Sequence, residues 1–225
     1  MIMKSTKTSC KNKIPVAIVF LGPPASGKGT AAAYFHKEFN YQSVSPGAIF
    51  KKLREEDSET AQLVRETVKD GGLCPDWLTD KLVLEESTKL IKKGAKSITL
   101  DGYPRTVEQL DFLIENYDVK LFVHSNTHWM TMKKMVVNRR NCKQCKALFS
   151  ALEPIKCCSK KECGIDDQSN WEIRWDDTAE FFGKRYNVYK KETLPVIDKV
   201  KNFNNYVKLD LIKDNLAYSK IIKLL

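Results

Sequence analysis

Residues 14–30 read IPVAIVFLGPPASGKGT, and this stretch decides the fold. Ile14–Leu21 is a short apolar run rich in β-branched residues, which predicts a strand buried on both faces. A glycine-rich turn follows, and the alanine-rich segment Thr30–Phe39 is expected to be helical. A buried strand that leads through such a turn into a helix is typical of α/β proteins with a parallel sheet.

The turn itself satisfies the pattern Gly-x-x-x-x-Gly-Lys. Its small residues let backbone N–H groups approach phosphate oxygens, and the N-terminus of the following helix adds partial positive charge. Lys28 would bring a full charge to the β- and γ-phosphates, and a hydroxyl nearby can help to hold Mg²⁺. Because Gly29 separates Lys28 from Thr30, Thr30 serves either the metal or the helix. The alternative reading is a strand-to-helix turn without a ligand. The predicted phosphate loop comprises Gly22, Pro23, Pro24, Ala25, Ser26, Gly27, Lys28, Gly29 and Thr30.

The rest of the chain continues the alternation of strands and helices. Further strands are expected at Gln42–Val44, Ser97–Leu100, Lys120–His124 and Tyr206–Leu209. Further helices are expected at Ala48–Lys69 (broken near Asp57 and Ser58), Asp80–Lys93, Thr106–Asn116, Thr131–Arg140, Thr178–Val200 and Ala217–Leu225. This order predicts a parallel sheet covered by helices on both faces, with ligands at the carboxyl ends of the strands.

Composition limits the class of protein. The 225 residues include 38 Lys or Arg and 28 Asp or Glu, a net charge of +10, and 42% are hydrophobic. This balance argues against a wholly disordered chain, and the positive charge favours a polyanionic partner, of which phosphate is the simplest. The longest apolar run is far shorter than the ~20 residues that span a bilayer. The first thirteen residues contain four lysines and no apolar stretch, so a cytoplasmic protein without a secretory signal is expected.

Four motifs, in this order, resemble those of the adenylate kinase family of nucleoside monophosphate kinases. They are GKGT at residues 27–30, LDGYPRT at residues 100–106, NRR at residues 138–140 and RWDDTAEFFGKR at residues 174–185. In the second motif, Tyr103 stands where the family has Phe. The resemblance extends from about Ile14 to the C-terminus.

This resemblance implies a three-layer P-loop NTPase fold and a reversible reaction in which Mg-ATP and AMP give two ADP. It also implies two inserts in the core, one that binds the monophosphate and one that forms a lid. The expected boundaries are 1–13 for an N-terminal tail, 14–44, 76–137 and 177–225 for the core, 45–75 for the monophosphate insert and 138–176 for the lid. The expected partners are the nucleotides ATP, AMP and ADP, with no nucleic acid or membrane, and a monomeric state.

The resemblance also assigns roles. Guanidinium groups stay charged and bind phosphate in a bidentate fashion, which suits a reaction in which charge spreads over the moving phosphoryl group. Arg105 would hold the acceptor's phosphate, Asp101 would position Mg²⁺ through water, and Gln109 would read the acceptor's base. The catalytic set is Lys28, Asp101, Arg105, Arg139, Arg174 and Arg185. The donor site comprises the nine residues of the phosphate loop and Arg139. The acceptor site comprises Lys51, Gly102, Arg105, Gln109, Arg174 and Arg185.

The chain departs from the family in two places. Residues 45–51 read SPGAIFK where the family has Ser-Thr-Gly-Asp-x-x-Arg, so a hydroxyl, a carboxylate and a guanidinium are missing. Lys51 keeps positive charge but lacks the bidentate fork, and Arg54, one helical turn later, is a candidate substitute. Met135 replaces an arginine that stacks on the donor base in the family. Acceptor identity and the choice between ATP and GTP therefore stay open.

The predicted lid is basic and rich in cysteine. Five of the seven cysteines lie between Cys142 and Cys163, and residues 131–163 carry nine Lys or Arg and two acidic residues, a net charge of +7. Cys142-x-x-Cys145 matches one half of a zinc ribbon, whereas the second half has irregular spacing. The favoured ligands of a structural zinc are Cys142, Cys145, Cys158 and Cys163, with Cys157 as the alternate. Reduced cysteines in a lid held by other contacts are the alternative.

Two other functions compete with a kinase. The basic charge and the zinc-ribbon-like cysteines also fit a nucleic-acid-binding protein, although that class leaves the phosphate loop unexplained. The changes at Pro46 and Lys51 also fit a nucleotide-binding relative whose turnover is impaired.

Overall fold

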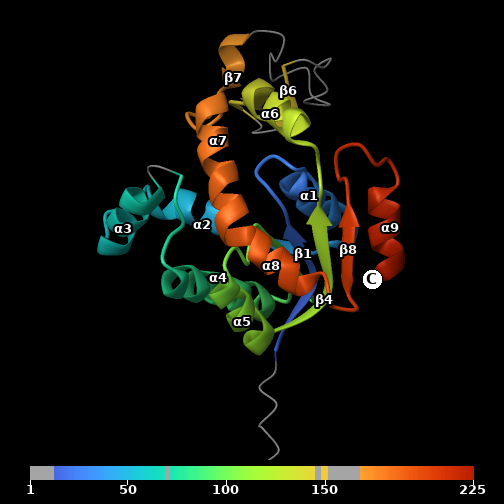
Figure 1. The fold of residues 1–225 in the computed structure, drawn as a ribbon. Helices are drawn as coiled ribbons and strands as arrows, with labels where there is room; N and C mark the ends of the chain where they lie inside the picture. Colours follow the sequence, from blue (N-terminus) through green and yellow to red (C-terminus); the bar gives the residue numbers. More distant parts are fainter. Residues whose placement is uncertain (1–12, 69–70, 145–147, 152–167) are drawn as a thin grey trace, which may run out of the picture.

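The central sheet has five strands, all parallel, in the order β2-β3-β1-β4-β8 (Figure 1). A computed structural model describes residues 13–68, 71–144, 148–151 and 168–225. The strands of the sheet are β1 (Ile14–Leu21), β2 (Gln42–Val44), β3 (Ile98–Asp101), β4 (Tyr117–Ser125) and β8 (Tyr206–Leu209).

Helices cover both faces of this sheet because its central strand is apolar on both sides. On one face, Val19 of β1 lies in a buried cluster with Val83, Leu110 and Val196. These three residues belong to α4 (Asp76–Lys92), α5 (Val107–Asn116) and α8 (Leu194–Val200). On the other face, Ile18 belongs to a cluster with residues of α1 (Lys28–Phe39) and α9 (Ala217–Leu224). The predicted α/β fold with a parallel sheet between two helical layers is confirmed.

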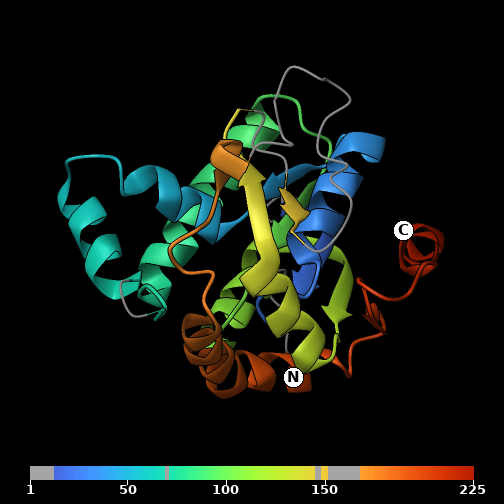
Figure 2. The same ribbon diagram turned by 90° about the horizontal axis from the view of Figure 1, so that it is seen from above.

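Two groups of elements lie outside these layers. The helices α2 (Pro46–Leu53) and α3 (Glu59–Val68) project to one side of the sheet (Figures 1 and 2). Beyond the carboxyl ends of the strands lie α6 (Trp129–Asn138) and a small antiparallel sheet in the order β6-β5-β7 (Figure 1). The strands of this sheet are β5 (Arg139–Cys142), β6 (Leu148–Ser150) and β7 (Trp171–Glu172), and the 3₁₀ turn η2 (Gln168–Asn170) precedes β7.

Some predicted helix boundaries were wrong. The helix expected at Thr131–Arg140 begins at Trp129, after the His128 cap, and ends at Asn138. It ends there because Arg139–Cys142 pairs with two other strands instead. The helix expected from Asp80 begins at Asp76, directly after Pro75, which is suited to a helix start because it has no N–H to satisfy.

The long helix predicted at Thr178–Val200 is present, with an irregularity. It consists of α7 (Ala179–Val188), the π-helical turn η3 (Tyr189–Thr193) and α8, and Thr178 caps its start. The π turn comes just before Pro195. A proline inside a helix lacks a donor and crowds the carbonyl four residues earlier, and a wider turn relieves both problems.

Candidate active site

Three strands of the central sheet end at the same edge. Phe20 pairs with Asp101 and Leu21 pairs with His124, so the carboxyl ends of β1, β3 and β4 are level. The glycine-rich loop follows β1, and Gly102 follows β3. Ligands of parallel α/β sheets bind at this edge, where the ends of several strands place polar groups side by side.

The shape of the loop depends on its first glycine. Gly22 has φ +137°, and a Cβ at this position would lie 2.6 Å from the carbonyl oxygen of Ser125. The Ser125 hydroxyl, at the end of β4, donates to the carbonyl of Ser26 and fixes the loop to the sheet. Gly27, in the left-handed region, caps the start of α1. The first N–H groups of α1 therefore face the loop without helical partners, which makes an anion site.

Lys28 lies within this loop. Its Nζ donates to the Pro23 carbonyl at 2.6 Å and to the Ser26 hydroxyl at 3.4 Å. Desolvation by the surrounding protein lowers the pKa of Lys28 to about 8, although the negative charge of Asp101 opposes this shift. The positive charges of Arg105 and Arg185 act in the same direction as desolvation. The side chain is still mainly protonated at neutral pH. The loop thus surrounds a cation that has lost part of its hydration and gains from an anionic ligand.

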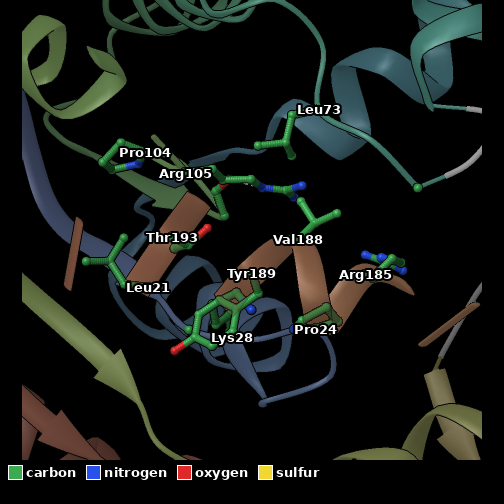
Figure 3. Close-up of a pocket in the computed structure, with 13 residues that line it drawn as sticks. Leu21, Pro24, Lys28, Leu73, Pro104, Arg105, Arg185, Val188, Tyr189 and Thr193 are labelled. Atoms are coloured by element: carbon green, nitrogen blue, oxygen red, sulfur yellow. Dashed lines mark hydrogen bonds between the residues drawn. The ribbon is translucent and has the colours of Figure 1, made fainter. Parts of the chain in front are cut away.

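Two clefts meet beside the loop. The first, of about 530 Å³, is lined by Lys28, Arg105 and Arg185 together with Tyr189 (Figure 3). The second, of about 820 Å³, extends toward α2 and is lined by Gln109 among others. Both clefts share Arg105 and Arg185. If one ligand occupied each cleft, the ends of the two ligands that face each other would lie between the guanidinium groups of Arg105 and Arg185.

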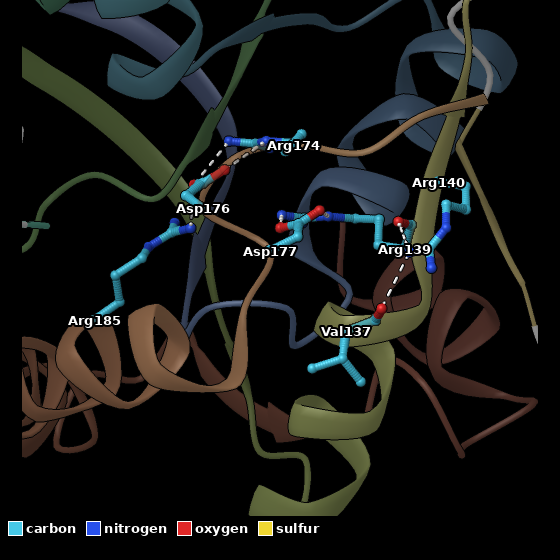
Figure 4. A network of polar contacts seen from close by, with 7 residues as sticks. All are labelled: Val137, Arg139, Arg140, Arg174, Asp176, Asp177 and Arg185. Carbon is cyan, nitrogen blue, oxygen red and sulfur yellow. Dashed lines mark hydrogen bonds and ion pairs between the residues drawn. The ribbon is translucent and has the colours of Figure 1, made fainter. Parts of the chain in front are cut away.

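Two buried aspartates organise the arginines of the site (Figure 4). Asp176 accepts from Arg174 Nε at 3.1 Å and from Arg185 at 3.0 Å. Asp177 accepts two hydrogen bonds from Arg139, one of them from Nε at 2.7 Å. Burial, and then the charge of nearby Arg105, lowers the pKa of Arg185 to about 10. These aspartates belong to the motif at residues 174–185 but had no predicted role, although their position between Arg174 and Arg185 was a usable signal.

Adjacent arginines differ in orientation. Arg139 turns to Asp177, whereas Arg140 donates to the carbonyls of Val137 and Arg139 at 3.1 and 2.7 Å (Figure 4). Arg139 lines neither cleft in this arrangement. Its predicted contact with donor phosphates therefore stays a prediction, and it requires β5 to approach the loop.

The structure separates Lys51 from the other predicted acceptor residues. Gly102, Arg105, Gln109, Arg174 and Arg185 line the second cleft, as their predicted role requires. Lys51 is exposed and lines neither cleft.

Asp101 lies at the opening of the loop. A Cβ on Gly29 would lie 3.3 Å from Asp101 Oδ2, so this carboxylate faces the start of α1. Thr30, in the first turn of α1, is exposed. A carboxylate next to an anion site is where a divalent cation bridging to phosphate would be held.

Gln109 is fixed by an aspartate that sequence analysis missed. Its Oε1 accepts from the Arg105 N–H at 2.8 Å, and its Nε2 donates to Asp76 at 2.7 Å. Asp76 also accepts from the Thr106 hydroxyl at 2.9 Å. These bonds orient the amide at the wall of the second cleft. The signal was missed because α4 was expected to begin only at Asp80.

Another buried aspartate, Asp80, accompanies the replacement of the family's phenylalanine by Tyr103. The Tyr103 hydroxyl donates to Asp80 at 2.6 Å, and both residues are buried. Desolvation raises the pKa of Asp80 from 3.8 to about 6, more than the bond from Tyr103 lowers it, and the charge of Asp76 adds to the rise. Asp80 is therefore ionised and buried at neutral pH.

Asp80→Asn is expected to increase the free energy of unfolding by about 1–2 kcal/mol at pH 7.5. The amide oxygen still accepts from Tyr103, and the buried charge is removed. The folded pKa of Asp80 lies above the unfolded value, so the wild type loses stability as pH rises from about 4 to about 6. Urea unfolding at pH 4, 6 and 7.5 measures the difference, which should vanish at pH 4. Asp118→Asn, at an exposed position, is the control. An Asp80→Asn protein that is less stable at pH 7.5 would contradict the prediction.

The proposed zinc ligands fall mostly beyond the part of the chain that the structure describes. Cys142 is buried at the end of β5. Cys145, Cys158 and Cys163, and the alternate Cys157, lie outside the described residues. Among the described residues, no three His, Cys, Asp or Glu side chains are grouped to hold a metal ion.

Comparison with known proteins gives one consistent result. The family model described as adenylate kinase matches residues 20–205. The adenylate kinase of Orientia tsutsugamushi (strain Boryong) is 35% identical over 210 residues, which is 92% of this chain and 95% of the relative. The adenylate kinase of Borreliella burgdorferi is 34% identical over 221 residues, 93% of this chain and 98% of the relative. That of Rickettsia prowazekii is 30% identical over 192 residues, with 84% and 88% covered.

Proposed function

Because the chain belongs to the adenylate kinase family, we propose that it transfers the γ-phosphoryl group of ATP to AMP and so forms two ADP. The observation that carries this proposal is the meeting of two clefts at Arg105 and Arg185, with Lys28 in one of them. An oxygen of the AMP phosphate attacks the γ-phosphorus of ATP, and the bond to the β-phosphate oxygen breaks. The reverse reaction uses two ADP.

The donor phosphates bind to the loop. Lys28 and the free N–H groups at the start of α1 neutralise the β- and γ-phosphates, and Ser26 and Ser125 keep the loop in place. Arg185 reaches the moving group from α7, and Arg174 and Arg139 join it when the lid closes. Asp176 and Asp177 hold these guanidiniums in fixed orientations, so little side-chain reorganisation remains once the lid has closed.

The acceptor lies in the second cleft. Arg105 holds its phosphate next to the first cleft, where the attack occurs, and Gln109 presents its fixed amide to the base. No nucleophilic side chain is needed, because the acceptor's own phosphate attacks. The protein therefore acts mainly by positioning and by stabilising charge.

Adenylate kinases use ATP together with Mg²⁺. The residues present fit this ion, because the Asp101 carboxylate faces the opening of the loop and has no ion pair among the described residues. Bound Mg²⁺ would neutralise charge on the β- and γ-phosphates. Asp101 would hold it through coordinated water, and the Thr30 hydroxyl is near enough in sequence to assist.

Closure of the two inserts completes the site. We assign residues 45–75 to the monophosphate insert, residues 138–176 to the lid, and the remainder after the 1–13 tail to the core. Closure excludes water, which would otherwise accept the phosphoryl group. Hydrogen exchange with and without a bisubstrate analogue measures closure, and protection in neither insert would contradict it.

A panel of nucleotides tests the function. Purified protein is mixed with Mg-ATP or Mg-GTP and with AMP, dAMP, GMP, CMP or UMP, and the products are separated by chromatography. Rapid ADP formation from ATP and AMP is expected. Preference for another monophosphate would show that Pro46 and Lys51 redirect the acceptor, and tight ATP binding without turnover would indicate an impaired relative.

We also propose a structural zinc in the lid, bound by Cys142, Cys145, Cys158 and Cys163. The buried position of Cys142 at the end of a short strand supports it, because so small an insert has little core of its own. Elemental analysis of untagged protein should give about one zinc per chain. Cys142→Ser should lose most of this zinc, and a folded, metal-free wild type would contradict the proposal.

The oligomeric state, the cellular location and the absence of a membrane partner are separate predictions. No helix in the described part of the chain is long and apolar enough to cross a membrane. The monomeric state and the cytoplasmic location stay predictions, and light scattering of the purified protein measures the first.

A further inference from the structure

One face of α2 forms a wall of the acceptor cleft. Pro46, Gly47, Phe50 and Arg54 line the cleft, and Pro46, Phe50 and Arg54 repeat every four residues, the spacing of one helix face. Arg54 lies at the C-cap of α2 and keeps helical backbone angles, so its side chain continues this face. Lys51 follows Gly47 by four residues and so lies at the edge of this face, about 100° around the helix from Phe50. Its side chain is exposed and does not line the cleft.

Arg54 differs from the other arginines of the cleft in its partners. Arg174 and Arg185 share the carboxylate of Asp176. The Nε of Arg54 is buried and has no hydrogen-bond partner among the described residues. The ion pairs of the described residues include none made by Arg54. A buried donor without an acceptor is unfavourable, and a ligand that supplies one relieves the cost.

The backbone around Arg54 is fixed from the neighbouring helix. Arg65 of α3 donates to the carbonyl of Arg54 at 3.2 Å and to that of Glu56 at 3.0 Å. These bonds hold the corner between α2 and α3. Arg54 therefore starts from a defined position on the wall, with only its side chain free to adjust.

The charge of the cleft indicates what this guanidinium would bind. Arg54 joins Arg105, Arg174 and Arg185 in lining it, and among the described residues that line the cleft the only carboxylate is that of Asp176, which two of these arginines already share. Four guanidiniums around one carboxylate favour a ligand with more than one negative charge. A phosphate monoester dianion has the charge and the acceptor oxygens that a guanidinium fork binds.

We propose that Arg54 binds the phosphate of the acceptor nucleotide and takes the role that the resemblance assigned to position 51. The assignment rests on the proposed function of the cleft. It explains how the chain can dispense with an arginine at position 51, because the fork is supplied one helical turn later, on the face that lines the cleft.

Arg54→Gln is expected to raise KM for AMP at least tenfold and to leave KM for ATP within twofold. Lys51→Gln should raise KM for AMP less than threefold. Lys52→Gln, which removes one exposed charge from the same helix, is the matched control and should match the wild type. Arg54→Lys keeps the charge without the fork and should recover part of the loss.

Calorimetric binding measurements separate the contribution of the phosphate to affinity from that of the base. Arg54→Gln should weaken binding of AMP at least tenfold and leave binding of adenosine unchanged, because adenosine lacks the phosphate. Equal weakening of both ligands would place Arg54 at the base or in the structure of the cleft and overturn the proposal. An increase in KM for AMP in Lys51→Gln but not in Arg54→Gln would also overturn it.

The same experiments distinguish failure of the Arg54 assignment from failure of the proposed kinase function. If the wild type binds AMP but makes no ADP, the function fails, and the comparison of AMP with adenosine still decides the role of Arg54. Circular dichroism and thermal unfolding verify that Arg54→Gln folds. If the Arg54→Gln protein does not fold, the Arg54→Lys protein tests the proposal instead. A KM for AMP equal to that of the wild type would then overturn the proposal.

Discussion

Lys28→Met is expected to lower kcat/KM for ATP by roughly 10³-fold or more while the protein keeps its fold. The loop surrounds a partly desolvated ammonium group whose hydrogen bonds run to the Pro23 carbonyl and the Ser26 hydroxyl. Methionine fills similar space without charge. The loop itself should survive, because Gly22, Ser125 and the start of α1 shape it independently of the ammonium.

The measurement is steady-state turnover of ATP and AMP, with thermal unfolding as the test of folding. Lys37→Met is the matched control, since Lys37 lies on the same helix with its side chain 83% exposed. Its kinetics should equal those of the wild type. Near-normal turnover in Lys28→Met would remove the loop from the mechanism and with it the proposed donor site.

Arg185→Met is expected to lower kcat by about 10³-fold, because this guanidinium lines both clefts. Its effect should fall on kcat more than on either KM, since the moving phosphoryl group lies between donor and acceptor. Loss of Arg185 also leaves Asp176 with Arg174 as its one remaining arginine partner among the described residues.

Lys184→Met is the control for Arg185, because Lys184 is exposed and pairs only with Glu180 at the surface among the described residues. Arg185→Lys should restore a small part of the activity, because an ammonium group cannot bind Asp176 and a phosphate with one planar fork. A rise in KM for AMP with kcat unchanged would mean that Arg185 only binds the acceptor. That result would contradict its place at the transfer point.

The overall fold could be predicted because its signals are local. Ile14–Leu21 is apolar at every position but one, which identified the strand buried on both faces, and β1 has those bounds. The break near Asp57 separated α2 from α3 as expected. Helix ends were less reliable. Arg139 and Arg140 continue a helical pattern in sequence, yet they pair with Ser150 and Phe149 of β6. The rest of their strand pairs with β7, which lies far along the chain.

The candidate site was predicted where several residues form one motif. The loop at residues 22–30 and the segment at residues 100–106 supply part of the first cleft, including Lys28 and Arg105, whereas Val188, Tyr189 and Thr193 were not predicted there. The bonds of Asp76 to Gln109 and of Asp177 to Arg139 span 33 and 38 residues. Nothing in the sequence near Asp76 or Gln109 indicates the first bond, and the one signal for the second was the position of Asp177 between Arg174 and Arg185.

The sequence by itself determined the alternation of strands and helices, the phosphate loop and the membership of a kinase family. Each of these follows from hydrophobic periodicity, backbone freedom at glycine or a short run of residues. Only the tertiary structure decided that Arg105 and Arg185 line both clefts, and that Arg54 rather than Lys51 lines the second one. The physical reason is that the direction and desolvation of a charged side chain depend on what packs around it, and those neighbours come from distant parts of the chain.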